Sequence, residues 1–424
     1  MINSDAINEF CEIYQNISKT YKGQLPLNAA ENIMSDFCKL PLCTALQEKY
    51  ILGSAINYDF DNNFLGSSSL FELYSLINRQ CNKLFSSVYA EARTLSGLNA
   101  LLTLLMSLFN IEDKILITSI DCGGHSSLNL FCKRLGIQTE ELPYDYENKD
   151  FNYELINSKL ERENIRGIII CLSDIAFIPK IENIVLPPNC ILIYDATQIL
   201  GLIAGNVIEN PLEFFKDNEN FILIGATHKT LPGPTCGLVM TNNLILAEKF
   251  DRKVNPNYLR NIQLHQVASL IFTLAEFELY GKDYSIQIIN NSNALGYYMK
   301  NYGFDVITKS EKFSETHQLF INNNSLRISE ENCLKYGISL NFRNKPIYNG
   351  HGIRIGVQEV TRYGYSEKEM ESIAKIFYNI SKDDKNDTEI KLMIKELLAK
   401  RTIKYTFEKN ELNEINAFLH NNKF

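Results

Sequence analysis

Two short apolar runs, each followed by a residue with chemistry of its own, most constrain how this chain can fold. Residues Ile191–Tyr194 lead directly to Asp195. Residues Phe221–Ile224 form the second run, and Lys229 follows it within a few residues. Short apolar runs bounded by turn signals are typical of buried strands. Because ligands bind at the carboxyl ends of strands in an α/β sheet, the sequence predicts that the aspartate and the lysine converge at that edge.

The lysine lies in the segment GATHKTLPGP, residues 225–234, where a histidine and two threonines surround it and a Pro/Gly turn follows. An amine in a partly desolvated pocket loses its proton more readily and can form a Schiff base with an aldehyde. An aspartate such as Asp195 can pair with a pyridinium nitrogen, which pyridoxal phosphate needs to act as an electron sink. A lone lysine would more often be an exposed turn residue, so the pairing with the aspartate is what favours this chemistry.

The motif THKTL followed by GP resembles the cofactor-lysine motif of serine hydroxymethyltransferase, a fold-type I pyridoxal-phosphate family. The segments GGH, which ends at His125, and GIRIG, which contains Arg354, also resemble motifs of that family. The resemblance runs from about residue 25 to 380. It implies an α/β fold with a large domain, whose mainly parallel seven-stranded sheet is sandwiched by helices, and a smaller α/β C-terminal domain. The domains expected from it are a helical arm (1–24), a cofactor-binding domain (25–280), a small domain (281–380) and a helical extension (381–424).

The resemblance also assigns roles to single residues around the cofactor pyridoxal 5'-phosphate. It implies that Lys229 forms the Schiff base, that Asp195 holds the protonated ring nitrogen, and that His125 stacks on the pyridine ring. Gln198 stands where the family has a histidine, which keeps hydrogen bonding but removes a titratable group. The other positions expected to bind the cofactor are Ser96, Gly97, Ser173, Gln198, His228 and Arg260.

Two segments are candidates for holding the cofactor phosphate. A Ser-Gly turn at a helix N-terminus, here Ser96-Gly97, offers unpaired N–H groups and the helix dipole to an anion. Leu98 stands where the family has a second serine, and an ordinary serine N-cap is the alternative interpretation. The glycine-rich phosphate loop of the family is replaced by YLRNI, residues 258–262. Arg260 in that segment could offer its charge to the phosphate, unless it is simply a solvated arginine.

Arg354 is the candidate for binding the substrate carboxylate. It stands among apolar residues in GIRIG, where an unpaired guanidinium would be costly. A planar carboxylate in bidentate geometry is its best partner. The resemblance implies that this partner is the α-carboxylate of an amino-acid substrate; a buried structural ion pair is the alternative.

Three polar positions of the family near the substrate are apolar in this chain. Leu52 stands where the family has its acid/base glutamate, and a leucine cannot transfer a proton. Ala30 replaces a serine and Leu65 replaces a tyrosine. Tyr50, which is also expected to contact the substrate, Glu31 or a group of the substrate itself would then have to move the hydroxyl proton. Folate is not expected to be used.

These changes lead to three hypotheses for the function. The first is aldol-type C–C bond formation or cleavage at Cα, as in a threonine aldolase or transaldolase, in specialised metabolism. The second is decarboxylation, oxidative deamination or β-elimination, because apolar surroundings destabilise a carboxylate. The third is a non-catalytic relative, suggested by the changed phosphate positions Leu98, Arg260 and Asn261; retention of Lys229 argues against it.

The composition suits a large soluble protein with more than one domain, since 45% of the 424 residues are hydrophobic and 22% are charged. The net charge of −8, without a long basic run, argues against nucleic acid as a partner. Neither a signal peptide nor an apolar run of about 18 residues is evident, so a cytoplasmic protein without a membrane span is expected. The ten cysteines show no CxxC pair, which predicts reduced core residues rather than disulfides or a metal site.

Apolar periodicity predicts the remaining elements. Helices are expected over 70–88 and from residue 97 to 109, a strand over 114–118, and alternating helices and strands over 129–171. Two further helices are expected over 263–280 and 283–301, and more helices after 387. The N-terminal helix is expected to pack on the body of the protein or on a partner subunit, since the family forms homodimers with shared active sites.

Overall fold

The computed structural model describes residues 4–56, 66–216, 218, 220–324, 326–382 and 387–423. Leu65, one of the substituted positions, lies outside the described residues. The chain divides into two compact units. The large unit comprises residues 30–286, 345–347 and 405–424, and the small unit comprises residues 1–29, 287–344 and 348–404.

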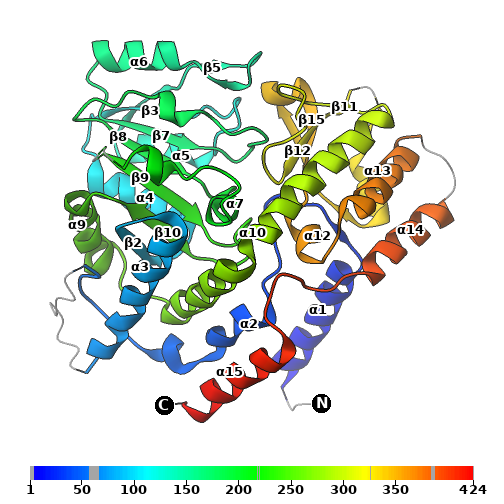
Figure 1. Ribbon diagram of the computed structural model, residues 1–424, viewed down its shortest axis with the longest axis horizontal. Helices are drawn as coiled ribbons and strands as arrows, with labels where there is room; N and C mark the ends of the chain where they lie inside the picture. Colours follow the sequence, from blue (N-terminus) through cyan, green and yellow to red (C-terminus); the bar gives the residue numbers. More distant parts are fainter. Residues whose placement is uncertain are drawn as a thin grey trace. The chain divides into compact units, whose positions relative to one another are not determined.

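The large unit is built on a seven-stranded sheet (Figure 1). All strands from β9 to β4 are parallel, and β10 is antiparallel to both of its neighbours. The mainly parallel seven-stranded sheet expected from the sequence is thereby confirmed. In spatial order the strands are β2 (Tyr89–Thr94), β10 (Gly237–Thr241), β9 (Phe221–Ala226), β8 (Ile191–Asp195), β7 (Gly167–Cys171), β3 (Lys114–Ile117) and β4 (Gln138–Glu141).

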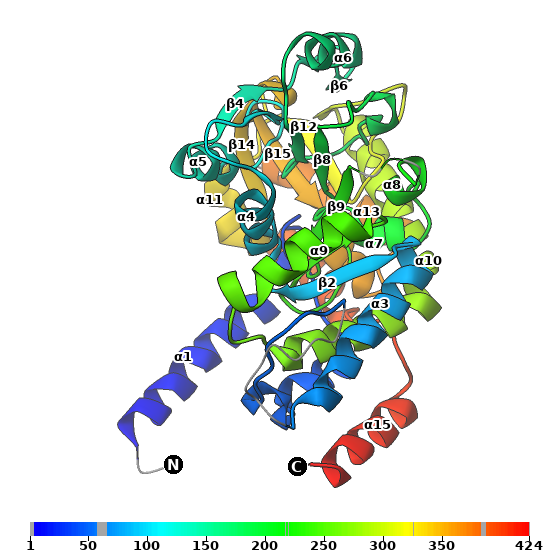
Figure 2. The ribbon, with the colours of Figure 1, turned by 90° about the vertical axis from the view of Figure 1, so that its left-hand side faces the viewer.

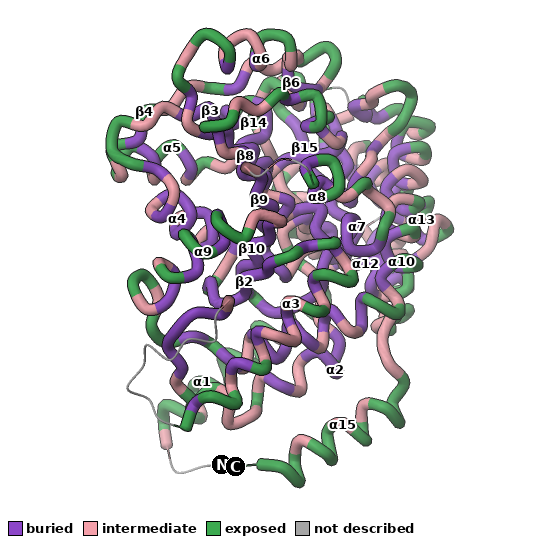
Figure 3. The backbone as a smooth tube through the Cα atoms, turned by 60° about the vertical axis from the view of Figure 1, so that its left-hand side comes forward, coloured by how far each residue is buried: buried purple, intermediate pink, exposed green. Residues whose placement is uncertain are grey.

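The central strands are buried because helices cover the sheet. The continuous apolar sequences of β7, β8 and β9 are typical of strands covered on both faces. Helices α4 (Gly97–Leu108), α5 (Ser127–Arg134) and α9 (Leu244–Arg252) contribute to one hydrophobic core with these strands. Figure 2 shows α4 and α9 on the same face of the sheet. Strands β9 and β10 are buried in Figure 3, whereas α15 (Lys409–Asn421) has no buried residue.

Other elements of the large unit follow the expected pattern. Helix α3 (Phe71–Phe85) occupies the predicted range and packs on β2. Helix α6 (Tyr153–Arg162) connects β4 towards β7, as the predicted alternation requires. The short elements of this unit are α2 (Asp36–Lys39), α7 (Leu200–Ala204), α8 (Pro211–Phe214), β5 (Tyr144–Asp145) and β6 (Asp150–Phe151).

The small unit contains a four-stranded sheet in the order β11 (Asp305–Val306), β12 (Gln318–Asn322), β15 (Gly350–Gly356) and β14 (Asn341–Lys345). Helix α13 (Glu367–Ser381) begins with a capping box between Ser366 and Glu369 and buries an apolar face. Strand β1 (Leu25–Pro26) pairs with β13 (Ile338–Ser339). The other helices are α11 (Glu330–Tyr336), α12 (Gln358–Arg362) and α14 (Asp387–Ala399), the last of which confirms a helix in the tail.

The prediction of two helices between residues 263 and 301 is wrong. A single helix, α10, runs from Leu264 to Asn301. The expected interruption falls near Gly281, but a glycine costs a helix only about 1 kcal/mol and does not end it. Phe277 and Tyr284, on either side of that glycine, are both buried, so side-chain packing maintains the helix through it.

Helix α1 (Asp5–Lys22) has no buried residue. Its apolar side chains follow the helical period and are exposed; they are Ile7, Phe10, Ile13, Tyr14, Ile17 and Tyr21. The helix predicted for the N-terminus therefore exists, but its apolar face is not covered within the described chain.

The structure also describes the cysteine thiols and the polarity of the helices, for which the sequence makes predictions. All ten cysteines carry free thiols and eight of them are buried, as predicted for core residues; Cys11 and Cys43 are exposed. Among the described residues, every helix is either too short or too polar to cross a membrane.

Candidate active site

Strands β8 and β9 place the two key residues at one edge of the sheet. Asp195 is the last residue of β8, and its Cα partner on β9 is Ile224. The N–H of Ala196 donates to the carbonyl oxygen of Ile224 at 2.8 Å, so the two chains are still paired where the aspartate ends its strand. Lys229 follows the end of β9 by three residues and is half-buried. The aspartate and the lysine thus come from the carboxyl ends of adjacent parallel strands, as expected.

The backbone around Lys229 is fixed by side chains. Thr227 donates its hydroxyl to the carbonyl oxygen of Pro234 at 2.6 Å and closes the turn after the lysine. Thr230 donates to the carbonyl oxygen of Gln198 at 2.9 Å, which joins the lysine segment to the segment after β8. The side chain of Asn32 donates to the carbonyl oxygen of Lys229 itself.

Asp195 is oriented by donors on both of its oxygen atoms. Its Oδ1 accepts the N–H of Thr197 at 2.9 Å, and its Oδ2 lies 3.1 Å from the Sγ atom of Cys171. Cys171 is the Cα partner of the aspartate on β7. Burial, and then the charge of Asp195, raise the pKa of the Cys171 thiol well above its usual value, so the sulfur keeps its proton and donates. A carboxylate held in this way can accept a hydrogen bond from a ring N–H.

The N-terminus of α4 packs very closely on the end of β9. A Cβ atom on Gly97 would lie 2.9 Å from the Cβ of Ala226 and 3.0 Å from the hydroxyl of Thr197, so only glycine fits without displacement. The hydroxyl of Ser96 accepts the N–H of Asn99 at 3.2 Å and caps the helix. The serine is therefore an N-cap, and the N-terminus of α4 lies against the end of β9. The expected contact of Ser96 and Gly97 with the cofactor phosphate remains a prediction.

His125 lies within range of both charged residues. Burial lowers its pKa, Lys229 and Lys345 lower it further, and Asp195 opposes them. Its Nδ1 accepts the N–H of Ser127 at 3.2 Å, which assigns the proton of the neutral ring to Nε2. Gly124 allows the close approach of this segment, because a Cβ atom there would lie 2.4 Å from the carbonyl oxygen of Ser119.

His228 is a second neutral histidine beside the lysine. Burial, and then the charge of Lys229, lower the pKa of His228 to about 4. At neutral pH this ring is therefore uncharged, and it does not compete with Lys229 for an anionic group.

Sequence reasoning missed an ion pair next to Ser173. The Nζ atom of Lys345 lies 2.6 Å from Oδ2 of Asp174, whose side chain is fully buried. The N–H of Ser173 donates to Gly123, which places the pair beside the segment that carries His125. No sequence pattern indicated this contact, because its partners are 171 positions apart.

The remaining candidates differ in how far they are buried. Glu31 and Arg260 are exposed and Tyr50 is half-buried, whereas Leu52 and Gln198 are buried. The catalytic and binding roles expected for these residues remain predictions.

Arg354 lies in the small unit. It is on β15 and only 3% exposed. Its Nη2 and Nε atoms donate to Oδ1 of Asn341 at 2.7 and 3.2 Å. The amide of Asn341 thus orients the guanidinium, and the role of Arg354 at a substrate carboxylate remains a prediction.

The residues at the edge of the large sheet fit pyridoxal phosphate. Lys229 could offer an amine, Asp195 an oriented carboxylate that accepts a hydrogen bond from a ring N–H, and His125 a neutral aromatic ring; these roles remain predictions. A lysine for the Schiff base and a carboxylate partner for the pyridinium nitrogen are the groups by which proteins hold this cofactor.

The chain is similar to known proteins along most of its length. A family model described as serine hydroxymethyltransferase matches residues 3–377. The serine hydroxymethyltransferase of Archaeoglobus fulgidus is 30% identical over 418 residues, which cover 94% of this chain and 93% of that protein. The enzyme of Sulfolobus acidocaldarius is 28% identical, with 90% of each chain covered. A crystal structure of L-threonine transaldolase from Pseudomonas fluorescens, in the internal aldimine state, has a TM-score of 0.90, with 23% identity and coverage of 99% of this chain and 97% of that chain.

Proposed function

The chain belongs to the serine hydroxymethyltransferase family, and we propose that it uses this fold for folate-independent, aldol-type chemistry at the Cα atom of an amino acid. It is a pyridoxal 5'-phosphate-dependent enzyme of the transferase or lyase type that acts on small amino acids. The alternative of a non-catalytic relative is therefore set aside. The observation that carries the proposal is Leu52, whose side chain is only 7% exposed at the position of the family's acid/base glutamate.

The bound cofactor supplies an electron sink that stabilises negative charge at Cα. We infer that Lys229 provides the amine that holds the cofactor and that Asp195 keeps the ring nitrogen protonated. His125 is proposed to lie against the ring. Its lowered pKa supports this role, because a neutral imidazole does not oppose the positive charge of the ring.

Arg354 is proposed to hold the carboxylate of the substrate. Asn341 orients the buried guanidinium through a single oxygen atom, and a planar carboxylate is the partner that suits a guanidinium best in bidentate geometry. Tyr50 is proposed to move the hydroxyl proton of the substrate, since it is half-buried and only two positions from Leu52. Glu31 is the other candidate, although it is exposed.

The proposed reaction cleaves L-threonine to glycine and acetaldehyde, or passes the glycine unit to a second aldehyde. Its support includes the L-threonine transaldolase that shares this fold. Decarboxylation is the second candidate, because the buried Leu52 would destabilise a carboxylate placed beside it. Oxidative deamination and β-elimination belong to the same alternative.

We also propose a homodimer and a cytoplasmic location. The exposed apolar face of α1 supports the dimer, because a second copy could cover side chains that lie open in one chain. The ten free thiols support a reducing compartment.

The test is incubation of the cofactor-loaded enzyme with L-threonine in the absence of folate, with and without benzaldehyde as the second aldehyde. Release of equal amounts of glycine and acetaldehyde, or formation of a β-hydroxy amino acid from benzaldehyde, supports the proposal. Release of CO₂ supports decarboxylation instead, and activity only with added tetrahydrofolate overturns folate independence. Lys229→Ala should abolish the absorbance band of the bound cofactor and all of these activities.

A further inference from the structure

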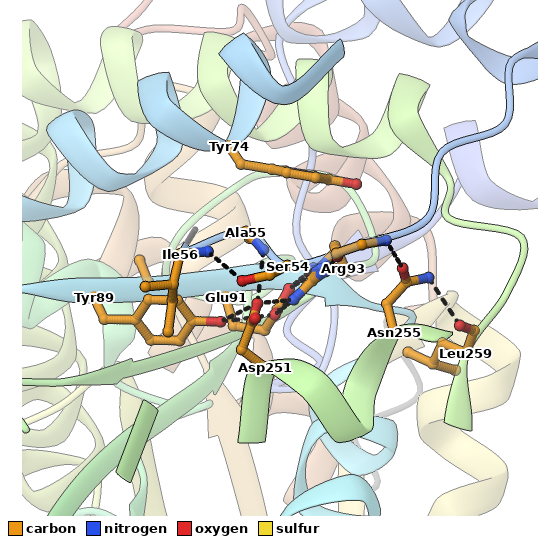
Figure 4. Close-up of polar contacts among 12 residues, drawn as sticks. Ser54, Ala55, Ile56, Tyr74, Tyr89, Glu91, Arg93, Asp251, Asn255 and Leu259 are labelled. Atoms are coloured by element: carbon orange, nitrogen blue, oxygen red, sulfur yellow. Dashed lines mark hydrogen bonds and ion pairs between the residues drawn. The ribbon is translucent and has the colours of Figure 1, made fainter. Parts of the chain in front are cut away.

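Arg93, on β2, is the centre of a buried cluster of charges (Figure 4). Its guanidinium forms ion pairs with Glu91 on the same strand and with Asp251 on α9. All three side chains are almost completely buried. Tyr89 donates its hydroxyl to Glu91 at 2.9 Å, and the ring of Tyr74 lies 5.4 Å from the guanidinium.

A buried cluster of charges contributes little net stability to a fold. It holds one positive charge against two carboxylates, and removing such charges from water offsets much of their attraction. Apolar side chains of similar volume often stabilise a fold at least as well. The cluster therefore calls for an explanation in terms of what it holds in place.

What it holds is a segment without regular secondary structure. The Nη1 atom of Arg93 donates to the carbonyl oxygen of Gly53 at 2.7 Å. The N–H of Ala55 donates to Oδ1 of Asp251 at 2.8 Å. Gly53 has a φ of 128°, which side-chain-bearing residues rarely adopt, so this backbone is bent at the residue that the arginine contacts. Leu52 comes immediately before it.

Asn255 connects the same segment to a second one. Its Oδ1 accepts the N–H of Gly53 at 2.8 Å, and its Nδ2 donates to the carbonyl oxygen of Leu259 at 2.9 Å. Arg260 is the next residue. A single buried amide thus joins the backbone beside Leu52 to the backbone beside Arg260 (Figure 4).

We propose that Arg93, Glu91, Asp251 and Asn255 form a positioning network that holds segment 50–56 in register with segment 258–262. These segments carry Tyr50 and Leu52, which the proposed function places at the substrate, and Arg260, which the sequence predicts at the cofactor phosphate. The inference rests on that function. It adds that the two segments, both changed from the family pattern, are held as one unit.

Asn255→Ala tests the proposal, because it removes the bridge and leaves the charged cluster intact. Loss of a buried hydrogen bond should raise both the dissociation constant of pyridoxal phosphate and the KM for L-threonine by about tenfold, with a smaller change in kcat. The dissociation constant is measured by absorbance titration of the cofactor-free enzyme.

Asn323→Ala is the matched control. Asn323 is also buried and also joins one N–H to one carbonyl oxygen, both of Ile328, but it belongs to the small unit, whereas both segments belong to the large unit. We expect Asn323→Ala to lose about as much thermal stability as Asn255→Ala. The dissociation constant of pyridoxal phosphate and the KM for L-threonine should stay unchanged in this control. If Asn255→Ala also loses stability while both constants stay unchanged, its role is structural only and the proposal is overturned.

Arg93→Lys provides a second measurement. Lysine keeps the charge but cannot donate to two carboxylates and to Gly53 in the geometry of a guanidinium. In Arg93→Lys the KM for L-threonine should rise. The dissociation constant of pyridoxal phosphate should change less, because the hydrogen bond from Asn255 to Leu259 remains. An unchanged KM in a folded Arg93→Lys enzyme would count against the network. If L-threonine is not cleaved, spectral titration with glycine replaces KM, so failure of the proposed reaction is distinguished from failure of the positioning role.

Discussion

The Sγ atom of Cys171 lies 3.1 Å from Oδ2 of Asp195, on neighbouring strands at the same level of the sheet. The thiol is a weak donor, but it is the partner of one of the two oxygen atoms of the carboxylate that we assign to the cofactor ring. Burial keeps it protonated.

Cys171→Ala should therefore weaken cofactor binding. Loss of the thiol leaves Oδ2 of Asp195 without this donor, and we expect the dissociation constant of pyridoxal phosphate to rise by roughly threefold to tenfold. Cys190→Ala is the control, since Cys190 is equally buried just before β8. Equal cofactor constants in the two variants would contradict the assignment.

Lys345→Met should destabilise the fold. The change leaves the carboxylate of Asp174 buried without its ammonium partner, at a cost of about 3 kcal/mol in the free energy of unfolding. The double variant Lys345→Met/Asp174→Asn should recover much of this loss, which a double-mutant cycle in urea would measure. Additive effects of the two changes would show that the pair is not coupled. Because Lys345 also lowers the pKa of His125, that pKa should rise in Lys345→Met, as histidine NMR would report.

His228 should make the fold less stable in acid. Its pKa is about 4 in the fold, against about 6.5 in an unfolded chain, so the unfolded state binds the proton first as the pH falls. Its contribution is complete above pH 6.5 and decreases between about 6.5 and 4, by up to roughly 3 kcal/mol. Urea unfolding at several pH values should show a shallower decline for His228→Asn. Parallel curves for the two proteins would contradict this account.

Gly97→Ala should displace the N-terminus of α4. The added Cβ atom would meet Ala226 at 2.9 Å, and the helix must move away from the sheet edge. We expect at least a tenfold weaker affinity for pyridoxal phosphate. Gly23→Ala is the control, because its Cβ atom would meet nothing closer than 3.4 Å. If Gly97→Ala bound pyridoxal phosphate with normal affinity, the N-terminus of α4 would not be part of the cofactor site.

The sequence predicted the parts of the fold whose signal is local. The apolar runs before Asp195 and Lys229 become β8 and β9, and their adjacency follows from the rules for parallel sheets. The N-cap at Ser96 was foreseen as an alternative. The break expected near Gly281 did not occur, because tertiary packing of Phe277 and Tyr284 outweighs the low helix propensity of one glycine.

The polar contacts could not be predicted in the same way. Cys171 meets Asp195 only because of the register between β7 and β8, and a shift of one residue would turn the thiol to the opposite face. Lys345 and Asp174 come from distant parts of the chain. Arg93 and Glu91 alternate along β2 like an exposed strand face, and only the fold shows that they are buried.

The anchoring of the Lys229 backbone has a consequence for the pace of turnover. Asn32 binds the carbonyl oxygen of Lys229, and Thr227 and Thr230 fix the turn on either side. The amine is thus carried by a long side chain whose backbone segment is held by hydrogen bonds. Rotamer changes take picoseconds to nanoseconds, whereas loops move in nanoseconds to microseconds. We expect side-chain rotation to be enough to bring the amine of Lys229 to the cofactor and to withdraw it after another amine has replaced it, so that positioning the amine needs no loop movement.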